Sequence, residues 1–263
     1  MKNFKVLIKK EFVQMIRDYK VIWLPIVFLF LGITQPITTY YLPLILESLG
    51  GGQGITIDPS TAAQKGGEVL AGTLGSQFDQ LGLMIIVISM MGIIQSDKSN
   101  GMLAFILTRP VPVISYIGGK IVSNYLIIAF SVSIGYFASY LYVNYLFTDV
   151  PFSHMITALL FYLAWVLFIV SFTTMISTMF KSQGIIALIS IVFLMGCRIG
   201  ASLSPSSDYV NPATMSKHAM ESLITGTLNS NEIVYVLLTI ICILLPLLVT
   251  NYWIANKKFN YQN

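Results

Sequence analysis

The 263 residues are 56% hydrophobic and only 10% charged, against about 25% charged residues in ordinary soluble domains. With a mean hydropathy of +0.78, this composition excludes a soluble globular fold, because a chain of this length could not bury so much apolar surface in its own core. The formal net charge is +4, and the two cysteines lack the spacing of a metal site or a redox pair. The sequence therefore predicts an all-α membrane protein.

Residues 1–20 predict an amphipathic helix that lies in the membrane interface. Apolar residues recur along one helical arc, opposite lysines such as Lys9 that would face anionic headgroups. A simple positively charged anchor is the alternative. Glu11 breaks the pattern, because it falls within the apolar arc, where an unpaired carboxylate is unfavourable. We therefore expect Glu11 to form a buried ion pair or hydrogen bond with the inner end of a span or with the 97–112 segment, where Arg109 is the expected basic partner.

Six apolar runs predict six transmembrane helices. They cover residues 21–46, about 74–94, about 121–146, 155–180, 184–200 and 233–255. The second begins near Leu74, which would put Asp79 just inside its outer end. The central portions of the spans contain no Asp, Glu, Lys, Arg or His, which argues against an ion-coupled carrier or a proton relay.

The distribution of basic residues predicts the topology. If both chain ends, the connection after the second span and the turn at 181–183 are cytoplasmic, most of the 15 basic residues lie inside. The chain is then a single domain over residues 1–263 of a multi-pass plasma-membrane protein. Residues 201–232, which combine turn signals with a short helical stretch, would form an outer cap.

The connection at 97–112 is the strongest functional signal. It predicts a short cytoplasmic helix that is apolar nearly all round and that two prolines terminate. Such a helix should bury itself against the inner ends of the spans or in the groove of a partner. The candidate contact residues are Asp97, Gly101, Leu103, Phe105, Ile106, Leu107, Arg109 and Pro110.

Two sets of small residues predict close helix packing. Gly196 and Gly200 form a Gly-x-x-x-Gly pair in the fifth span, and Ser131, Gly135 and Ser139 form a stripe in the third. Packing within the chain and packing between subunits both stay open for each set.

Arg198, near the outer end of the fifth span, has two interpretations. Its side chain could reach the interface by itself, as long basic side chains do at membrane depth. Alternatively, it could pair with Asp79 as part of an outer gate. The sequence leaves both open.

Two of these segments, in this order, resemble those of type-2 ABC transporter permeases. That family opens with a Lys-Glu-containing interfacial helix, matched here by Lys10-Glu11-Phe12 and by Arg17-Asp18. Its segment after the second span is matched by Asp97, Gly101, Leu103, Ile106, Leu107, Pro110 and the later Lys120. Asp97 and Ala104 stand where the family has Glu, and Met102 where it has Thr.

The resemblance implies an exporter subunit without catalytic residues. The 97–112 segment would be the coupling helix that rests on a separate ABC ATPase, present in two copies. A second permease would complete a homo- or heterodimer, with Gly196 and Gly200 near the contact. No cofactor is expected on this chain, because ATP and Mg²⁺ would bind the ATPase. The partners are then this ATPase, the second permease and the lipid bilayer, with no nucleic acid.

Two other classes of protein remain alternatives. One is a membrane scaffold or sensor whose short helix docks a different cytoplasmic partner, and the other is an unrelated carrier or membrane enzyme. No metal site is expected, because His154 and His218 lack partners at ligand spacing. The substrate class stays open among peptides, lipids, amphiphilic drugs and ions.

Overall fold

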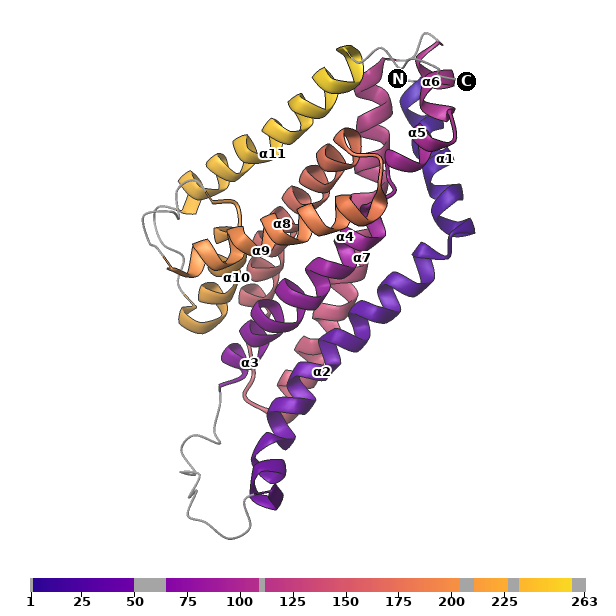
Figure 1. Cartoon of the computed structure of the whole chain (residues 1–263). Helices are drawn as coiled ribbons and strands as arrows, with labels where there is room; N and C mark the ends of the chain where they lie inside the picture. The colour runs from indigo at the N-terminus through magenta and orange to yellow at the C-terminus, as the bar shows by residue number, and fades with distance from the viewer. Residues whose placement is uncertain (1, 50–64, 109–111, 204–210, 227–231, 257–263) are drawn as a thin grey trace.

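The computed structural model describes residues 2–49, 65–108, 112–203, 211–226 and 232–256. Within these ranges every regular element is a helix. Six helical stretches are long and apolar enough to cross a membrane, which confirms the predicted all-α class and the number of spans (Figure 1). They cover residues 20–45, 66–99, 113–146, 152–179, 183–203 and 234–256.

The helices form an elongated bundle, and different helices lie at its two ends (Figure 1). One end, called here the α6 end, carries α1 (Lys2–Arg17), α5 (Gln95–Ser99), α6 (Met102–Leu107) and the last turns of α11 (Glu232–Asn256). The other, called the α10 end, carries α3 (Gly66–Gly72) and α10 (Thr214–Thr225), which pack against each other. Between them run α2 (Lys20–Leu49), α7 (Val113–Leu146), α8 (Phe152–Met179) and α9 (Gln183–Leu203).

The second span differs from its prediction. It starts at Gly66 rather than near Leu74, and it runs through α3, the π-helix η1 (Thr73–Gly82), α4 (Leu83–Met90) and α5. Asp79 therefore lies near the middle of the span Gly66–Ser99, so the expectation of uncharged span centres was wrong. The reason is that this polar stretch is covered by α2, α7 and α10 instead of by lipid, and hydropathy alone cannot detect such cover.

The closest helix contact joins α2 to α7. A Cβ on Gly32 would overlap the backbone carbonyl of Gly135, and a Cβ on Gly135 would overlap that of Phe28. Only glycine lets two backbones approach this closely. One turn further along α7, Ser139 and Thr73 share a hydrogen bond of 2.8 Å between their hydroxyls. The predicted stripe of small residues therefore packs inside the chain.

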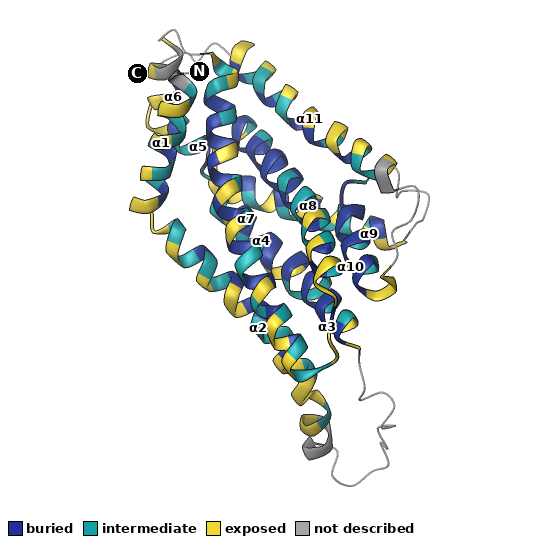
Figure 2. Ribbon diagram, turned by 180° about the vertical axis from the view of Figure 1, so that it is seen from behind, coloured by how far each residue is buried: buried dark blue, intermediate teal, exposed yellow. Residues whose placement is uncertain are grey.

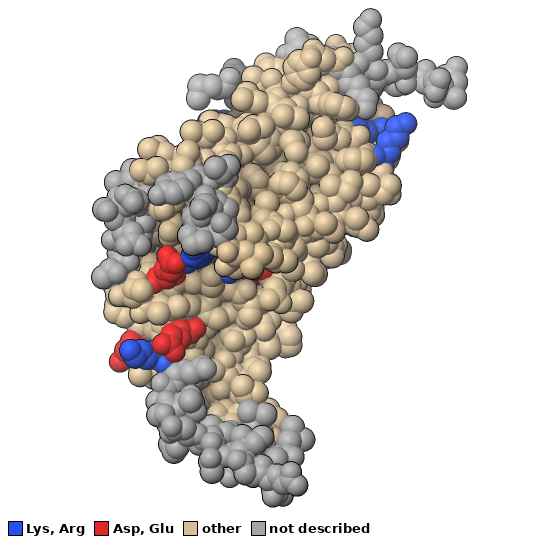
Figure 3. All heavy atoms as spheres, turned by 60° about the vertical axis from the view of Figure 1, so that its left-hand side comes forward, with Lys and Arg blue, Asp and Glu red and all other residues tan. Residues whose placement is uncertain are grey.

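Burial is concentrated in the central helices. Buried residues are frequent along α4, α7 and α8, whereas α2, α9 and α11 turn mostly half-buried or exposed residues outward (Figure 2). The exposed residues of α11 are largely apolar, among them Leu237, Leu244 and Leu248. Figure 3 shows a broad surface without charged side chains between the charged groups toward the two ends. A surface of this kind suits contact with the hydrocarbon of a bilayer.

Candidate functional site

Three charged side chains meet at the α6 end, and we call them the inner charged cluster: Glu11 of α1, Asp97 of α5 and Lys120 of α7. Lys120 Nζ lies 3.2 Å from Glu11 Oε1 and 3.1 Å from Asp97 Oδ2. All three residues are at most 5% exposed. The hydroxyl of Tyr116 donates a further hydrogen bond of 2.7 Å to Asp97 Oδ2. One cation thus joins two carboxylates from segments far apart in the sequence.

The structure pairs Glu11 with a different residue from the one expected. Its buried partner is Lys120, while Arg109 lies outside the described residues. Lys120 was placed in a connection because the apolar run begins at Ile121, yet α7 already begins at Val113. The signal that could have identified Lys120 is its position one helical turn after Tyr116, which places both side chains on one face of α7.

The predicted coupling segment, residues 97–112, contains the end of α5 and the whole of α6, with a glycine between them. Gly101 has a φ of +69°, in the left-handed region, and it separates α5 from α6. Within α6, Leu103 is buried, whereas Phe105 is 56% exposed. Ile106 and Leu107 lie in α6, while Arg109 and Pro110 fall outside the described residues. The segment therefore has one anchored side and one exposed apolar side.

Residues 91–94, which separate α4 from α5, are hydrogen-bonded to a side chain of α8. The Ser177 hydroxyl accepts hydrogen bonds from the backbone N–H groups of Ile94 and Gln95, at 3.2 and 3.1 Å, and donates one to the carbonyl of Met91. These backbone groups lose their helical partners at the break, so one side chain replaces several helical bonds. Lys98 adds hydrogen bonds to two carbonyls at the end of α8. The position of α5 is consequently linked to that of α8.

The residues of α1 that the family resemblance singled out have separate positions. Lys10 Nζ lies 3.7 Å from Glu11 Oε1 and 3.1 Å from Met102 Sδ of α6. Arg17 ends α1, and Asp18 lies in the elbow before α2; both are exposed. Lys10 thus bridges α1 and α6, whereas the charges of Arg17 and Asp18 face outward.

A second buried ion pair lies further toward the α10 end. Arg198 of α9 donates from Nε to Asp79 Oδ2 at 2.5 Å, and Asp79 is completely buried. The Ser216 hydroxyl of α10 donates to the same oxygen, and Arg198 also bonds Ser202 Oγ at 3.0 Å. The pair left open by the sequence is therefore formed, and it joins the π-helix η1, α9 and α10. π-Helical turns inside α-helices occur frequently at functional sites.

The second pair of small residues has a different environment from the α7 stripe. A Cβ on Gly196 would meet no described atom within 4 Å, and one on Gly200 would meet only Asn211, at 3.6 Å. Gly196 is exposed on α9. Nothing in the described part of the chain therefore packs against Gly196, and this face of α9 is open to lipid or to a second subunit.

The described residues hold no cluster of three or more His, Cys, Asp or Glu side chains that could bind a metal ion. The charged groups that the fold buries are paired with each other and join helices. This arrangement suits the transmission of movement between helices.

Comparison with known proteins identifies the family. The family described as ABC-2 family transporter protein matches residues 5–257, almost the whole chain. A relative in Bacillus subtilis (strain 168), the uncharacterized transmembrane protein YxlG, is 35% identical over 226 residues, which cover 86% of this chain and 87% of that protein. ABC-2 permeases are membrane transport subunits and generally act with an ABC ATPase. The chain belongs to the ABC-2 family of transporter proteins.

Proposed function

We propose that this chain is the permease subunit of an ATP-driven exporter, completed by a second permease and by two copies of an ABC ATPase. Both termini would be cytoplasmic, so that the α6 end faces the ATPase and the α10 end faces outward. ATP and Mg²⁺ would bind the ATPase alone. Family membership and the number of spans support the subunit type, and the distribution of basic residues supports the orientation.

The observation that carries the proposal is the inner charged cluster. Lys120 ties Asp97, five residues before the start of α6, to Glu11 of α1. Removing one member of a buried ion pair is strongly unfavourable, so the three helices should move as one unit. A displacement of α6 by the ATPase would therefore reach α1 and α7 directly. From α7 it would reach α2 through the close contact at Gly135.

ATP binding would act by shifting populations. If the closed ATPase pair binds the outward-open arrangement of α5 and α6 more tightly than the inward-open one, this difference in affinity drives the change. The Asp79–Arg198 pair would then serve as an outer gate, because it lies further toward the α10 end than the inner charged cluster and joins η1 to α9 and α10.

The test of the proposal is the variant Phe105→Asp, with Phe105→Leu as its control. A carboxylate on the exposed apolar side of α6 should weaken docking of the ATPase while the membrane level of the permease stays near normal. The measurements are co-purification of the ATPase and substrate-stimulated ATP hydrolysis in the same preparation. Wild-type values of both for Phe105→Asp would show that α6 is not the transmitting element.

A second pair of variants isolates the backbone conformation of the segment. Gly101→Val places a β-branched residue in the left-handed region, whereas Gly101→Asn places there a residue that tolerates it. We expect Gly101→Val to reduce coupled ATP hydrolysis and Gly101→Asn to retain most of it. Equal activity of the two would show that the turn at Gly101 is not needed for coupling.

A further inference from the structure

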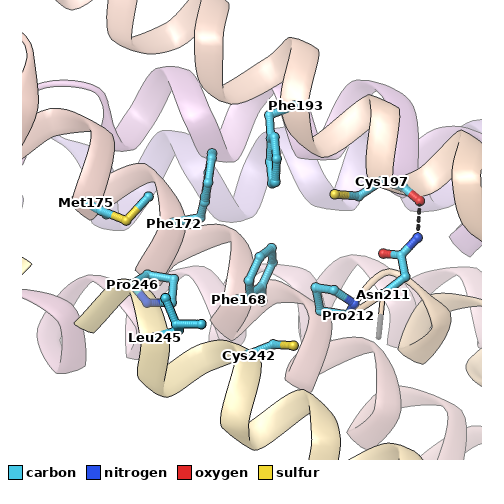
Figure 4. A pocket seen from close by; sticks show the side chains of 10 residues that line it. All are labelled: Phe168, Phe172, Met175, Phe193, Cys197, Asn211, Pro212, Cys242, Leu245 and Pro246. Atoms are coloured by element: carbon cyan, nitrogen blue, oxygen red, sulfur yellow. Dashed lines mark hydrogen bonds between the residues drawn. The ribbon is translucent and has the colours of Figure 1, made fainter. Parts of the chain in front are cut away.

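An apolar cavity of about 490 Å³ lies among α8, α9 and α11 (Figure 4). Its inner wall is formed by Phe168 and Phe172 of α8, which are nearly completely buried. Its rim is formed by Phe193 of α9 and Leu245 of α11, which are 47% and 59% exposed. The cavity therefore opens sideways, from the surface of the helix bundle toward its centre.

The lining offers no charge and no unsatisfied polar group. Asn211 supplies the one polar side chain, and the chain itself occupies both ends of its amide. Its Nδ2 donates to the carbonyl of Cys197 at 2.6 Å (Figure 4), and its Oδ1 accepts from the N–H of Ala213 at 3.0 Å. The remaining lining consists of aromatic rings, aliphatic groups and sulfur atoms. An occupant would gain contact energy here but no hydrogen bond, so it must be apolar.

The surroundings and the size of the cavity limit the occupant further. All three helices are membrane-spanning, so the opening faces hydrocarbon, and within the described ranges α8 packs against α9 and α11 without extensive contact between those two. A helix about 10 Å wide fills roughly 420 Å³ per turn of 5.4 Å. The cavity would take in little more than one such turn, so a spanning helix of a second subunit could not enter it as a whole. A thin, flexible hydrocarbon chain fits both the volume and the opening.

We propose that this cavity binds one acyl chain of a membrane phospholipid, which enters between α9 and α11. The aromatic wall supports this assignment. Phe172 and Phe193 stack with ring centroids 4.3 Å apart, and Phe168 continues the stack at 6.0 Å from Phe172. The rings thus form a continuous surface from the rim to the buried wall, along which an extended chain can lie. The inference goes beyond the proposed exporter function, because it requires neither the ATPase nor the second permease.

The experiment uses the full chain in phosphatidylcholine vesicles that contain some phosphatidylcholine with a diazirine midway along one acyl chain. After irradiation, mass spectrometry maps the cross-links. We expect yields at Phe193 and Leu245 several-fold above those at Leu126 and Phe130, which are equally exposed on α7 but lie outside the cavity. Yields no higher than at the α7 residues would overturn the proposal, and lower ones would indicate that protein covers the cavity.

Two matched variants test whether the cavity volume is responsible. Cys242→Trp adds a large ring to a lining position, and Ile240→Trp adds the same ring about 200° away around α11. We expect Cys242→Trp to lower the yield at Phe193 several-fold and Ile240→Trp to leave it unchanged. An equal effect of the two variants would contradict the proposal. If Cys242→Trp does not fold, the comparison of yields within the wild-type chain still decides.

Discussion

Lys120 is the central charge of the inner charged cluster at the α6 end. It is the cation between Glu11 and Asp97, and all three side chains are buried. Burying charges is unfavourable unless each finds a partner, and here a single ammonium serves two carboxylates. The neighbouring Lys10, at 3.7 Å from Glu11, and the hydroxyl of Tyr116, bonded to Asp97, complete the compensation.

Replacing Lys120 should therefore destabilise the chain strongly. We expect Lys120→Met to lower the free energy of unfolding by roughly 3–5 kcal/mol, because two carboxylates then lie buried without the cation between them. The measurement is unfolding of the purified chain in mixed micelles, with the exposed Lys181→Met as the control. A Lys120→Met chain as stable as Lys181→Met would show that water, not Lys120, compensates the cluster.

The Asp79–Arg198 pair allows a test by double substitution. Arg198→Met should destabilise the chain, because it leaves the carboxylate of Asp79 buried without its cation, although the hydrogen bond from Ser216 remains. Adding Asp79→Asn should recover much of the loss, because a neutral amide needs no cation and can still accept that hydrogen bond. Unfolding of the two single variants and the double variant gives the coupling energy. Strictly additive effects would mean that the pair contributes nothing to stability.

At the scale of the elements, Gly135 and Gly196 have different environments, although both belong to sets of small residues that predicted close packing. Gly135 lies against the backbone of α2, while Gly196 faces open space on α9. The same sequence pattern thus serves a contact within the chain in one case and leaves a face of the helix uncovered in the other.

This difference predicts that one added methyl group lowers the stability of the chain at Gly135 but not at Gly196. Gly135→Ala should lower the free energy of unfolding by about 1–3 kcal/mol, because the new Cβ would overlap the carbonyl of Phe28 and push α2 and α7 apart. Gly196→Ala should leave the stability of the single chain unchanged. Unfolding in mixed micelles compares the two variants. A large loss for Gly196→Ala without loss of dimer would refute the open environment of Gly196.

Subunit cross-linking through α9 calls for an exposed position. Ala201, beside the Gly-x-x-x-Gly pair, is buried within the chain and is unsuitable, whereas Ile199 is exposed on the same helix. If Gly196 lies at the contact between permeases, as the family resemblance implies, Gly196→Ala should also reduce cross-linking of an Ile199→Cys variant whose two native cysteines have been replaced.

At the scale of the whole molecule, α1, α5, α6 and the end of α11 lie together, and α3 and α10 lie at the opposite end (Figure 1). An even number of spans puts both ends of the membrane domain on one side, and the distribution of basic residues supports the proposal that this side is the cytoplasm.

Reporter fusions test this topology. A reporter enzyme that is active only outside the cytoplasm should work when fused after Pro59, Ser153 or Ser206 and should fail after Asn100 or Asn263, because the proposed orientation puts the first three positions outside. Fusion after Lys181 is a further control and should fail. Activity after Asn100 would overturn the proposed orientation.

Local composition was enough to predict the fold class. The six spans follow from runs of apolar residues, because a bilayer imposes the same length and hydropathy on every helix that contacts it. The Lys-Glu pair at Lys10 and Glu11 and the segment after the second span were likewise sufficient to suggest the family, which the match over residues 5–257 confirms. Each of these inferences uses information contained within about twenty consecutive residues.

The tertiary structure alone decided which charged groups meet. Glu11 and Lys120 are 109 positions apart, and no local pattern could pair them. Asp79 and Arg198 are 119 positions apart, and the sequence could offer their pairing only as one of two interpretations of Arg198. The early start of the second span at Gly66 escaped prediction for the same reason, because its polar residues are sheltered by other helices rather than by lipid. The environment of a membrane helix is lipid on one side and protein on the other, and only packing determines which side each residue faces.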